Sequence, residues 1–88
     1  LVIQSNAFNR SRIATIVVAG ITSNLRYAEL PGNVNLAKGE AGIPKPSVIN
    51  ISQIHSIDRM FIRSRIGALS PNKFEQVTEG LKTLFELK

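Results

Sequence analysis

Residues 14–26 read ATIVVAGITSNLR, and the rest of the chain is arranged around this stretch. Its β-branched and apolar run is typical of a strand that is buried on both faces, so we expect a central strand from Arg12 to Thr22. Gly20 interrupts the run and indicates a bulge or the close approach of another backbone. Because Thr22 is followed by Ser23, Asn24 and Arg26, two hydroxyls, an amide and a cation gather at one strand end.

This group of side chains has two interpretations. Hydroxyl, amide and guanidinium groups hold phosphates in complexes with nucleic acids, which favours a phosphate-binding site. The same residue types are also common in turns, so an ordinary loop at a strand end would look alike. The residues alone leave both interpretations open.

The length and the net charge of the chain limit the number of domains and the class of partner. The chain has 88 residues, enough for one small domain with a single core, and we treat residues 1–88 as one domain. Its net charge is +5, and the excess lies before the last helix: residues 1–69 carry eight bases and three acids, whereas residues 70–88 carry three of each. Polyanions are therefore the predicted class of partner, although many small basic proteins bind none.

Several classes of site are excluded or disfavoured. No cysteine is present, so disulfides and thiolate metal sites are excluded, and with a single histidine and scattered acids we expect neither a metal nor a cofactor. Apolar runs are too short for a membrane span, and the first residues lack the order of a signal peptide. We therefore expect no membrane partner and a cytoplasmic location.

The remaining elements follow from periodicity and from capping residues. Ser70 and Pro71 predict the start of a helix, and Asp58 predicts the cap of a short helical turn up to Arg63. Ser52-Gln53 interrupts an alternating strand and indicates a bulge. The fold class is α+β, a small β-barrel or curled sheet of about five strands with a C-terminal helix. The expected strands are Leu1–Ser5, Arg12–Thr22, Val34–Leu36, Val48–Ile57 and Arg65–Leu69, and the expected apolar face of the helix comprises Phe74, Val77, Leu81, Leu84 and Phe85.

Several other polar residues also have two interpretations each. His55 titrates near neutral pH and could act as an acid or base in RNA cleavage, or it could be a polar residue on the exposed face of a strand. The cluster Arg59, Arg63 and Arg65 could attract nucleic acid or could simply be solvated. Tyr27, beside Arg26, is the one aromatic residue to test for base stacking.

Four segments, in order, resemble the MazF/PemK family of toxins: LVIQSNAFNRSR, IVVAGITSNLRYAELPGNV, GEAGIPKPSVINISQIHSID and IGALSPNKFEQVTEGL. The resemblance covers essentially all 88 residues. It implies a homodimeric SH3-like barrel and a ribosome-independent, metal-independent endoribonuclease that cuts single-stranded RNA at short sequences. It also implies an acidic antitoxin protein whose C-terminal segment lies over the RNA groove.

The family's functional residues carry over in part. Thr22 matches the threonine that helps hold the scissile phosphate, so it is the catalytic candidate. The family's catalytic arginine and first hairpin match positions before Leu1, so we expect an N-terminally incomplete and impaired chain. An arginine and an aspartate used by the plasmid-borne branch match Asn50 and Ser52, which does not support that version of the chemistry. The candidate RNA-binding residues are Arg10, Arg12, Ser23, Asn24, Arg26, Gln53 and His55.

Two alternatives of other classes stay open. The basic domain could be a non-catalytic module that only docks RNA or an acidic antitoxin. It could also poison gyrase, as related barrel toxins do.

Overall fold

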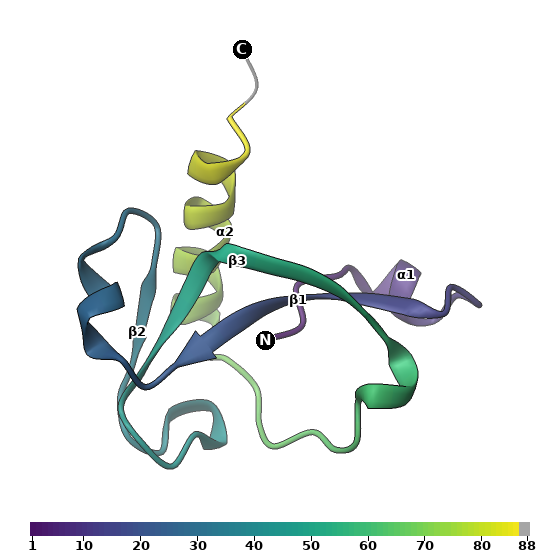
Figure 1. Cartoon of the computed structure of the whole chain (residues 1–88), viewed down its shortest axis with the longest axis horizontal. Coiled ribbons are helices and arrows are strands. Elements are labelled where there is room, and N and C mark those ends of the chain that lie inside the picture. Colours follow the sequence, from purple (N-terminus) through teal and green to yellow (C-terminus); the bar gives the residue numbers. More distant parts are fainter. Residues whose placement is uncertain (87–88) are drawn as a thin grey trace.

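The computed structural model describes residues 1–86. Its main elements are a three-stranded antiparallel sheet, in the order β1-β3-β2, and one long C-terminal helix (Figure 1). The α+β class is therefore confirmed. The bounds of these elements are β1 Thr15–Thr22, β2 Val34–Leu36, β3 Ser47–Asp58 and α2 Pro71–Leu84.

Four short helical turns complete the chain. Helix α1 (Asn6–Asn9) precedes β1, the 3₁₀ turns η1 (Leu25–Glu29) and η2 (Glu40–Gly42) join the strands, and η3 (Arg59–Phe61) follows β3. Two of them begin at a capping side chain. Asn24 Oδ1 accepts a hydrogen bond from Arg26 N at 3.2 Å, and Asp58 Oδ1 accepts one from Met60 N at 3.0 Å. The predicted cap at Asp58 is confirmed.

Strands β1 and β3 form a long two-stranded ribbon with one break in its register. Ala19 pairs with Ile54, but the next residue, Gly20, pairs with Asn50, so three residues of β3 bulge between these pairs. The bulge predicted at Ser52-Gln53 is confirmed. The Gln53 side chain lies over Gly20, and a Cβ at position 20 would lie 2.6 Å from Gln53 Oε1, so a larger residue there would have to displace this flexible side chain.

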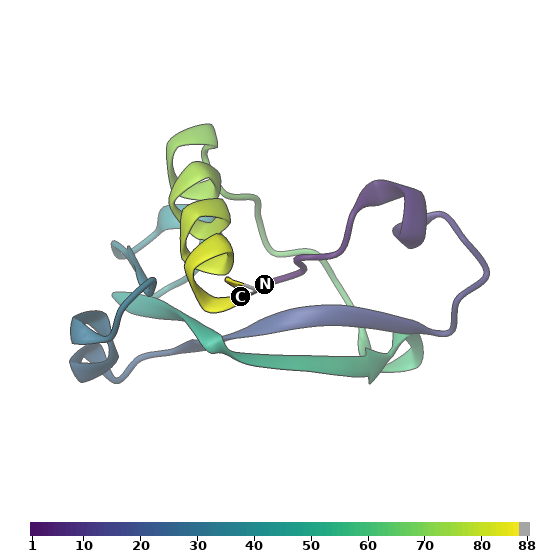
Figure 2. The same ribbon diagram turned by 90° about the horizontal axis from the view of Figure 1, so that it is seen from above.

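Helix α2 packs on one face of the sheet and closes the core (Figure 2). It begins as predicted, with Ser70 Oγ accepting from Lys73 N at 3.2 Å and Pro71 in the first turn. Each large apolar side chain that is fully buried contributes on the order of 1.5–3 kcal/mol to folding. The buried cluster consists of Ala19, Val34, Leu36, Ile49, Ile51 and Val77.

The predicted apolar face of α2 is only partly buried. Val77 is buried and Leu81 packs against the core, whereas Phe74 and Phe85 are 57% and 59% exposed and Leu84 is also exposed. The sheet beneath the helix is narrow, so only the middle of the helix meets it.

The five strands and the closed barrel are not found in residues 1–86, where the sheet has three strands and is open. Leu1 to Ile3 does run along β1, with Ala19 N donating to Leu1 O at 2.7 Å and Ile3 N to Val17 O at 3.1 Å, but it makes only an isolated bridge. The predicted strand Leu1–Ser5 stops there because the chain turns into helix α1, which begins at Asn6. Residues 65–69, expected to be a strand, have no regular structure.

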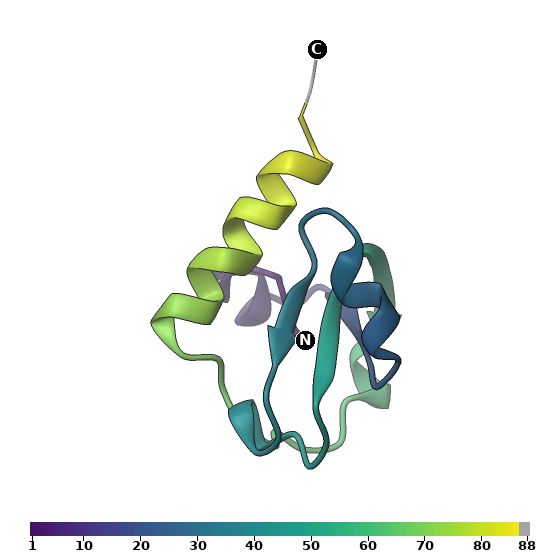
Figure 3. The same ribbon diagram turned by 90° about the vertical axis from the view of Figure 1, so that its left-hand side faces the viewer.

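Strand β2 is an edge of this sheet and lies next to β3 (Figure 3). Two side chains occupy part of its outer side. Lys73 Nζ donates to Asn35 O at 2.6 Å, and Glu40 Oε1 accepts from Ala37 N at 2.9 Å. Lys73 Nζ and Glu40 Oε1 lie 3.9 Å apart and form an ion pair. Among the helices of residues 1–86, none is long and apolar enough to cross a membrane.

Candidate functional site

Thr22 lies at the last position of β1 and is held by the turn that follows it. Its Oγ1 accepts a hydrogen bond from Asn24 N at 3.1 Å, and Asn24 in turn caps η1. A hydroxyl that accepts a hydrogen bond still has its own proton to donate. The half-buried Thr22 hydroxyl is therefore fixed in place and can donate to an anionic oxygen.

A shallow hollow of about 270 Å³ opens beside this turn. Its lining consists of Asn24, Arg26, Tyr27 and Leu30. The Arg26 guanidinium makes no hydrogen bond or ion pair with any part of the chain that the structure describes. The structure thus brings a cation and the one aromatic residue of interest together beside Asn24, whose backbone N–H holds Thr22. Leu30 carries no charge or motif, so sequence reasoning missed it.

Asn33 ties this turn to the sheet. Its Nδ2 donates to Tyr27 O at 2.8 Å, and its Oδ1 accepts from Ile51 N at 2.8 Å. Asn33 carries no charge and is not one of the candidate residues, so sequence reasoning missed it. Its side chain joins η1 to β3 and so sets the position of the hollow.

Asn50 and Ser52 form a neutral pair behind the site. Asn50 is buried, and its Oδ1 accepts from Ser52 Oγ at 3.0 Å and from Asn33 Nδ2 at 3.3 Å. No charge is present at these two positions. The structure therefore gives them a supporting role, in agreement with the departure from the plasmid-borne pattern.

Gln53 and His55 lie further along the ribbon, on the face that bears Thr22. Side chains alternate along a strand, so Thr22, Gly20 and Val18 share one face of β1. The Gln53 side chain lies over Gly20, and His55 pairs with Val18. Four residues of a strand span about 13 Å, so His55 is too far from Thr22 to act on the same phosphate.

Arg10 and Arg12 are not brought together with Thr22. Both are exposed in the segment between α1 and β1, at the opposite end of the ribbon (Figure 1). The eight residues of β1 separate the two ends by about 23 Å. Arg59, by contrast, is not a solvated arginine, because its guanidinium is bound to backbone carbonyls.

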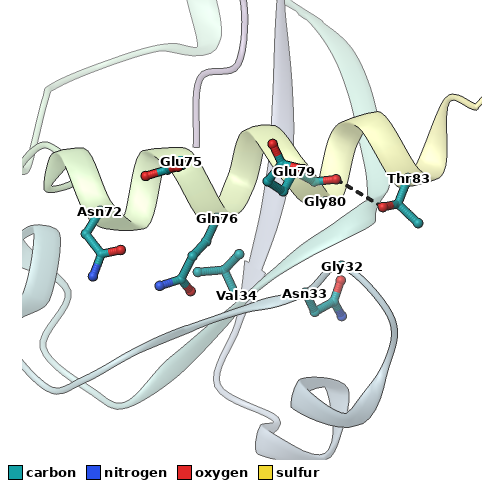
Figure 4. Close-up of a pocket in the computed structure, with 9 residues that line it drawn as sticks. All are labelled: Gly32, Asn33, Val34, Asn72, Glu75, Gln76, Glu79, Gly80 and Thr83. Atoms are coloured by element: carbon teal, nitrogen blue, oxygen red, sulfur yellow. Dashed lines mark hydrogen bonds between the residues drawn. The ribbon is translucent and has the colours of Figure 1, made fainter.

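A larger hollow of about 560 Å³ lies elsewhere, between α2 and the turn before β2 (Figure 4). Glu75 and Glu79 lie on its helical wall, and Gly32 and Val34 on the opposite wall. It contains none of the candidate residues. Its acidic wall also makes it unsuited to a phosphate.

The sequence of this chain is similar to those of known proteins. The chain matches the family described as PemK-like, MazF-like toxin of type II toxin-antitoxin system over residues 1–85. It is 37% identical over 87 residues to Endoribonuclease MazF6 of Mycobacterium tuberculosis and to Endoribonuclease MazF2 of Mycobacterium bovis. In each case the match covers 99% of this chain and 76% of the relative.

Solved structures of similar fold point the same way. The Mycobacterium tuberculosis toxin MazF-mt6 superposes with a TM-score of 0.86 at 22% identity, over 100% of this chain and 85% of the other. A mycobacterial endoribonuclease in complex with its cognate antitoxin superposes with a TM-score of 0.83 at 22% identity. This match covers 100% of this chain and 80% of the other. With a family match over nearly the whole chain and relatives at 37% identity, this chain belongs to the PemK-like, MazF-like toxins of type II toxin–antitoxin systems.

Proposed function

We propose that this chain is an endoribonuclease toxin that cleaves single-stranded RNA, including mRNA, at short sequences and without a metal ion. Its family and the names of its relatives support this function. The observation that carries it to particular residues is the Thr22 hydroxyl, which is fixed by Asn24 N at 3.1 Å. The same Asn24 lines the hollow that holds Arg26, whose guanidinium has no partner within residues 1–86.

The chemistry is transfer of the phosphate within the RNA chain. The ribose 2′-oxygen forms a bond to the adjacent phosphorus as the bond to the 5′-oxygen breaks, which leaves a 2′,3′-cyclic phosphate and a 5′-hydroxyl. In net terms, one proton moves from the 2′-hydroxyl to the 5′-oxygen. Thr22 orients the phosphate by donating to it, and Arg26 stabilises the charge that develops on its oxygens.

The remaining candidates would bind the flanking nucleotides. Gln53 and His55 lie on the same face as Thr22, one after the other along the ribbon. Ser23 and Asn24 belong to the turn itself. A single strand that follows this face would meet Thr22 first, then Gln53 and His55.

Cleavage of a fluorescent single-stranded RNA by Thr22→Ala tests the proposal. Loss of one donor to a developing charge lowers the rate by about 100-fold, whereas RNA binding weakens much less. Thr22→Ser keeps the hydroxyl and should retain most of the activity. Thr83→Ala, which removes an exposed hydroxyl on α2, serves as the matched control. Cleavage by Thr22→Ala at the wild-type rate would show that Thr22 is not part of the site.

The same samples separate the alternatives. A non-catalytic RNA- or antitoxin-binding module would shift the RNA in a gel without producing a cyclic phosphate. A gyrase poison would generate DNA breaks in the presence of gyrase and leave RNA intact.

We also propose two protein partners. An acidic antitoxin suits the net charge of +5, and one structural neighbour was solved with its cognate antitoxin. A homodimer suits the segment after β3, where Met60, Phe61 and Ile66 are 75%, 71% and 64% exposed. Exposed apolar side chains that lie together are typical of an interaction surface. Light scattering of Phe61→Ser should show a smaller species than wild type, and an unchanged mass would place the interface elsewhere.

A further inference from the structure

Arg59 binds a distant segment of the chain through its whole polar end. Its Nε donates to Ile13 O at 2.6 Å, one terminal nitrogen donates to Asn9 O at 2.7 Å, and the other donates to Phe8 O at 2.8 Å. The Arg59 backbone N–H adds a bond to Ala14 O at 2.8 Å. We call residues 8–14 the basic loop. Arg59 alone therefore binds four backbone carbonyls of the basic loop.

The basic loop has little else to fix it. Helix α1 contributes no buried residue, and Phe8 is 54% exposed, so the core does not hold this segment. Gln4 and Asn9 exchange two longer hydrogen bonds of 3.2 and 3.3 Å at the start of the loop. The remaining hydrogen bonds of the loop are local, such as Ser11 Oγ to Phe8 O at 2.6 Å.

The bonds of Arg59 leave its charge uncompensated. Carbonyls are neutral acceptors, and the ion pairs within residues 1–86 are Lys73–Glu40 and Lys82–Glu79, neither of which involves Arg59. The adjacent carboxylate of Asp58 faces the backbone N–H of Met60. The basic loop thus keeps the positive charges of Arg10 and Arg12 and gains that of Arg59.

We propose that Arg59 is a positioning residue that presents Arg10 and Arg12 to RNA phosphates beyond the end of β1 opposite Thr22. This inference rests on the proposed function. Arg59 does not touch the RNA; it acts by holding the carbonyls on either side of Arg10 and Arg12. The planar fork of a guanidinium spreads its donors over three nitrogens and so can reach three separate carbonyls, whereas the donors of an ammonium all leave from a single nitrogen.

Arg59→Lys tests this role because it keeps the charge and loses the fork. We expect the RNA dissociation constant and KM to rise about tenfold, close to the effect of losing two phosphate contacts, while kcat changes less than about twofold. Arg63→Lys, in an exposed arginine four residues away, should leave both constants unchanged.

The decisive comparison is the same substitution in the Arg10→Gln/Arg12→Gln double variant. If Arg59 acts through these two arginines, Arg59→Lys has no further effect on RNA affinity there. An equal loss of affinity in both backgrounds, or wild-type affinity of the single variant, would overturn the proposal.

Trypsin digestion gives a readout that does not depend on RNA. Trypsin cuts after arginine, so release of the basic loop in Arg59→Lys should speed cleavage after Arg10 and Arg12 about tenfold or more, as expected when a segment opens locally. Unchanged cutting would overturn the anchoring role. A wild-type chain that neither binds nor cuts RNA, yet shows this protection, would refute the proposed function and leave the anchor in place.

Discussion

The two ends of the β1–β3 ribbon are held by different kinds of side chain. At the end with Thr22, the neutral amide of Asn33 joins a carbonyl of η1 to a backbone N–H of β3. At the other end, the charged guanidinium of Arg59 gathers three carbonyls of the basic loop, and its backbone N–H binds a fourth. An amide both donates and accepts, so it can join unlike backbone groups, whereas a guanidinium only donates and needs several acceptors.

The difference indicates what each end requires. The Thr22 end carries the proposed chemistry, where a neutral support leaves the charge of Arg26 free to act on the phosphate. The far end carries only proposed binding, where an added positive charge is an advantage. Substitutions at the two ends should therefore have different effects, and the largest is expected at Asn33.

Asn33→Ala should destabilise the protein by about 2 kcal/mol, because it leaves the N–H of the buried Ile51 without a partner and removes one of the two hydrogen bonds that Tyr27 O accepts, the other coming from Leu30 N. Urea unfolding measures this change. Asn35→Ala is the matched control, since its exposed side chain makes no hydrogen bond within residues 1–86. Equal stability of the two variants would show that Asn33 does not support the Thr22 end.

Arg26→Gln should lower RNA cleavage by about tenfold, which corresponds to about 1.4 kcal/mol of transition-state stabilisation, with no change in stability. The stability is unaffected because the guanidinium has no partner in the described chain. Cleavage rate and melting temperature are measured together. Lys38→Gln removes one charge from an exposed loop elsewhere, and a similar loss of rate in that variant would reduce the role of Arg26 to net charge.

Asn24→Ala should cost about 1 kcal/mol, the usual effect of losing a capping side chain, and should loosen the turn beside Thr22. Asn24→Asp keeps an acceptor oxygen and should restore the stability. Thermal unfolding of the three proteins distinguishes these outcomes. If the aspartate variant is as unstable as the alanine variant, the cap is not what holds the turn.

Arg12→Gln should have the smallest effect. One lost phosphate contact reduces the slope of log affinity against log salt by about 0.7, without changing the cleavage rate at saturating RNA. Fluorescence anisotropy at several salt concentrations gives the slope. A fall in the saturated rate would mean that the far end of the ribbon takes part in the chemistry.

The sequence predicts well what depends on nearby residues. The bulge opposite Gly20 and the cap at Ser70 follow from local residue types and are found in the structure. Thr22 and Asn24 likewise adopt a turn through bonds between residues two apart. The role of Thr22 in catalysis stays a prediction. The prediction that β1 is a central strand buried on both faces was wrong, because β1 lies at an edge of the sheet and only Ile16 and Ala19 in it are buried.

What the sequence did not predict depends on distant partners. The carbonyls that bind Arg59 are 46 to 51 residues away, and nothing in the segment Asp58–Arg63 distinguishes an internally bound arginine from a solvated one. The predicted strand at residues 65–69 was wrong because apolar residues form a strand only where another strand offers an edge. The full apolar face of α2 was wrong because periodicity does not reveal how much sheet lies beneath a helix.

The ion pair at the edge of β2 has a consequence for how the protein behaves at high concentration. Lys73 and Glu40 already occupy the carbonyl of Asn35 and the N–H of Ala37, which an incoming strand would need. A charged edge of this kind resists sheet-to-sheet aggregation. Fibre growth through β2 would first have to break two hydrogen bonds and separate two charges, so the fold protects itself against uncontrolled polymerisation on that side.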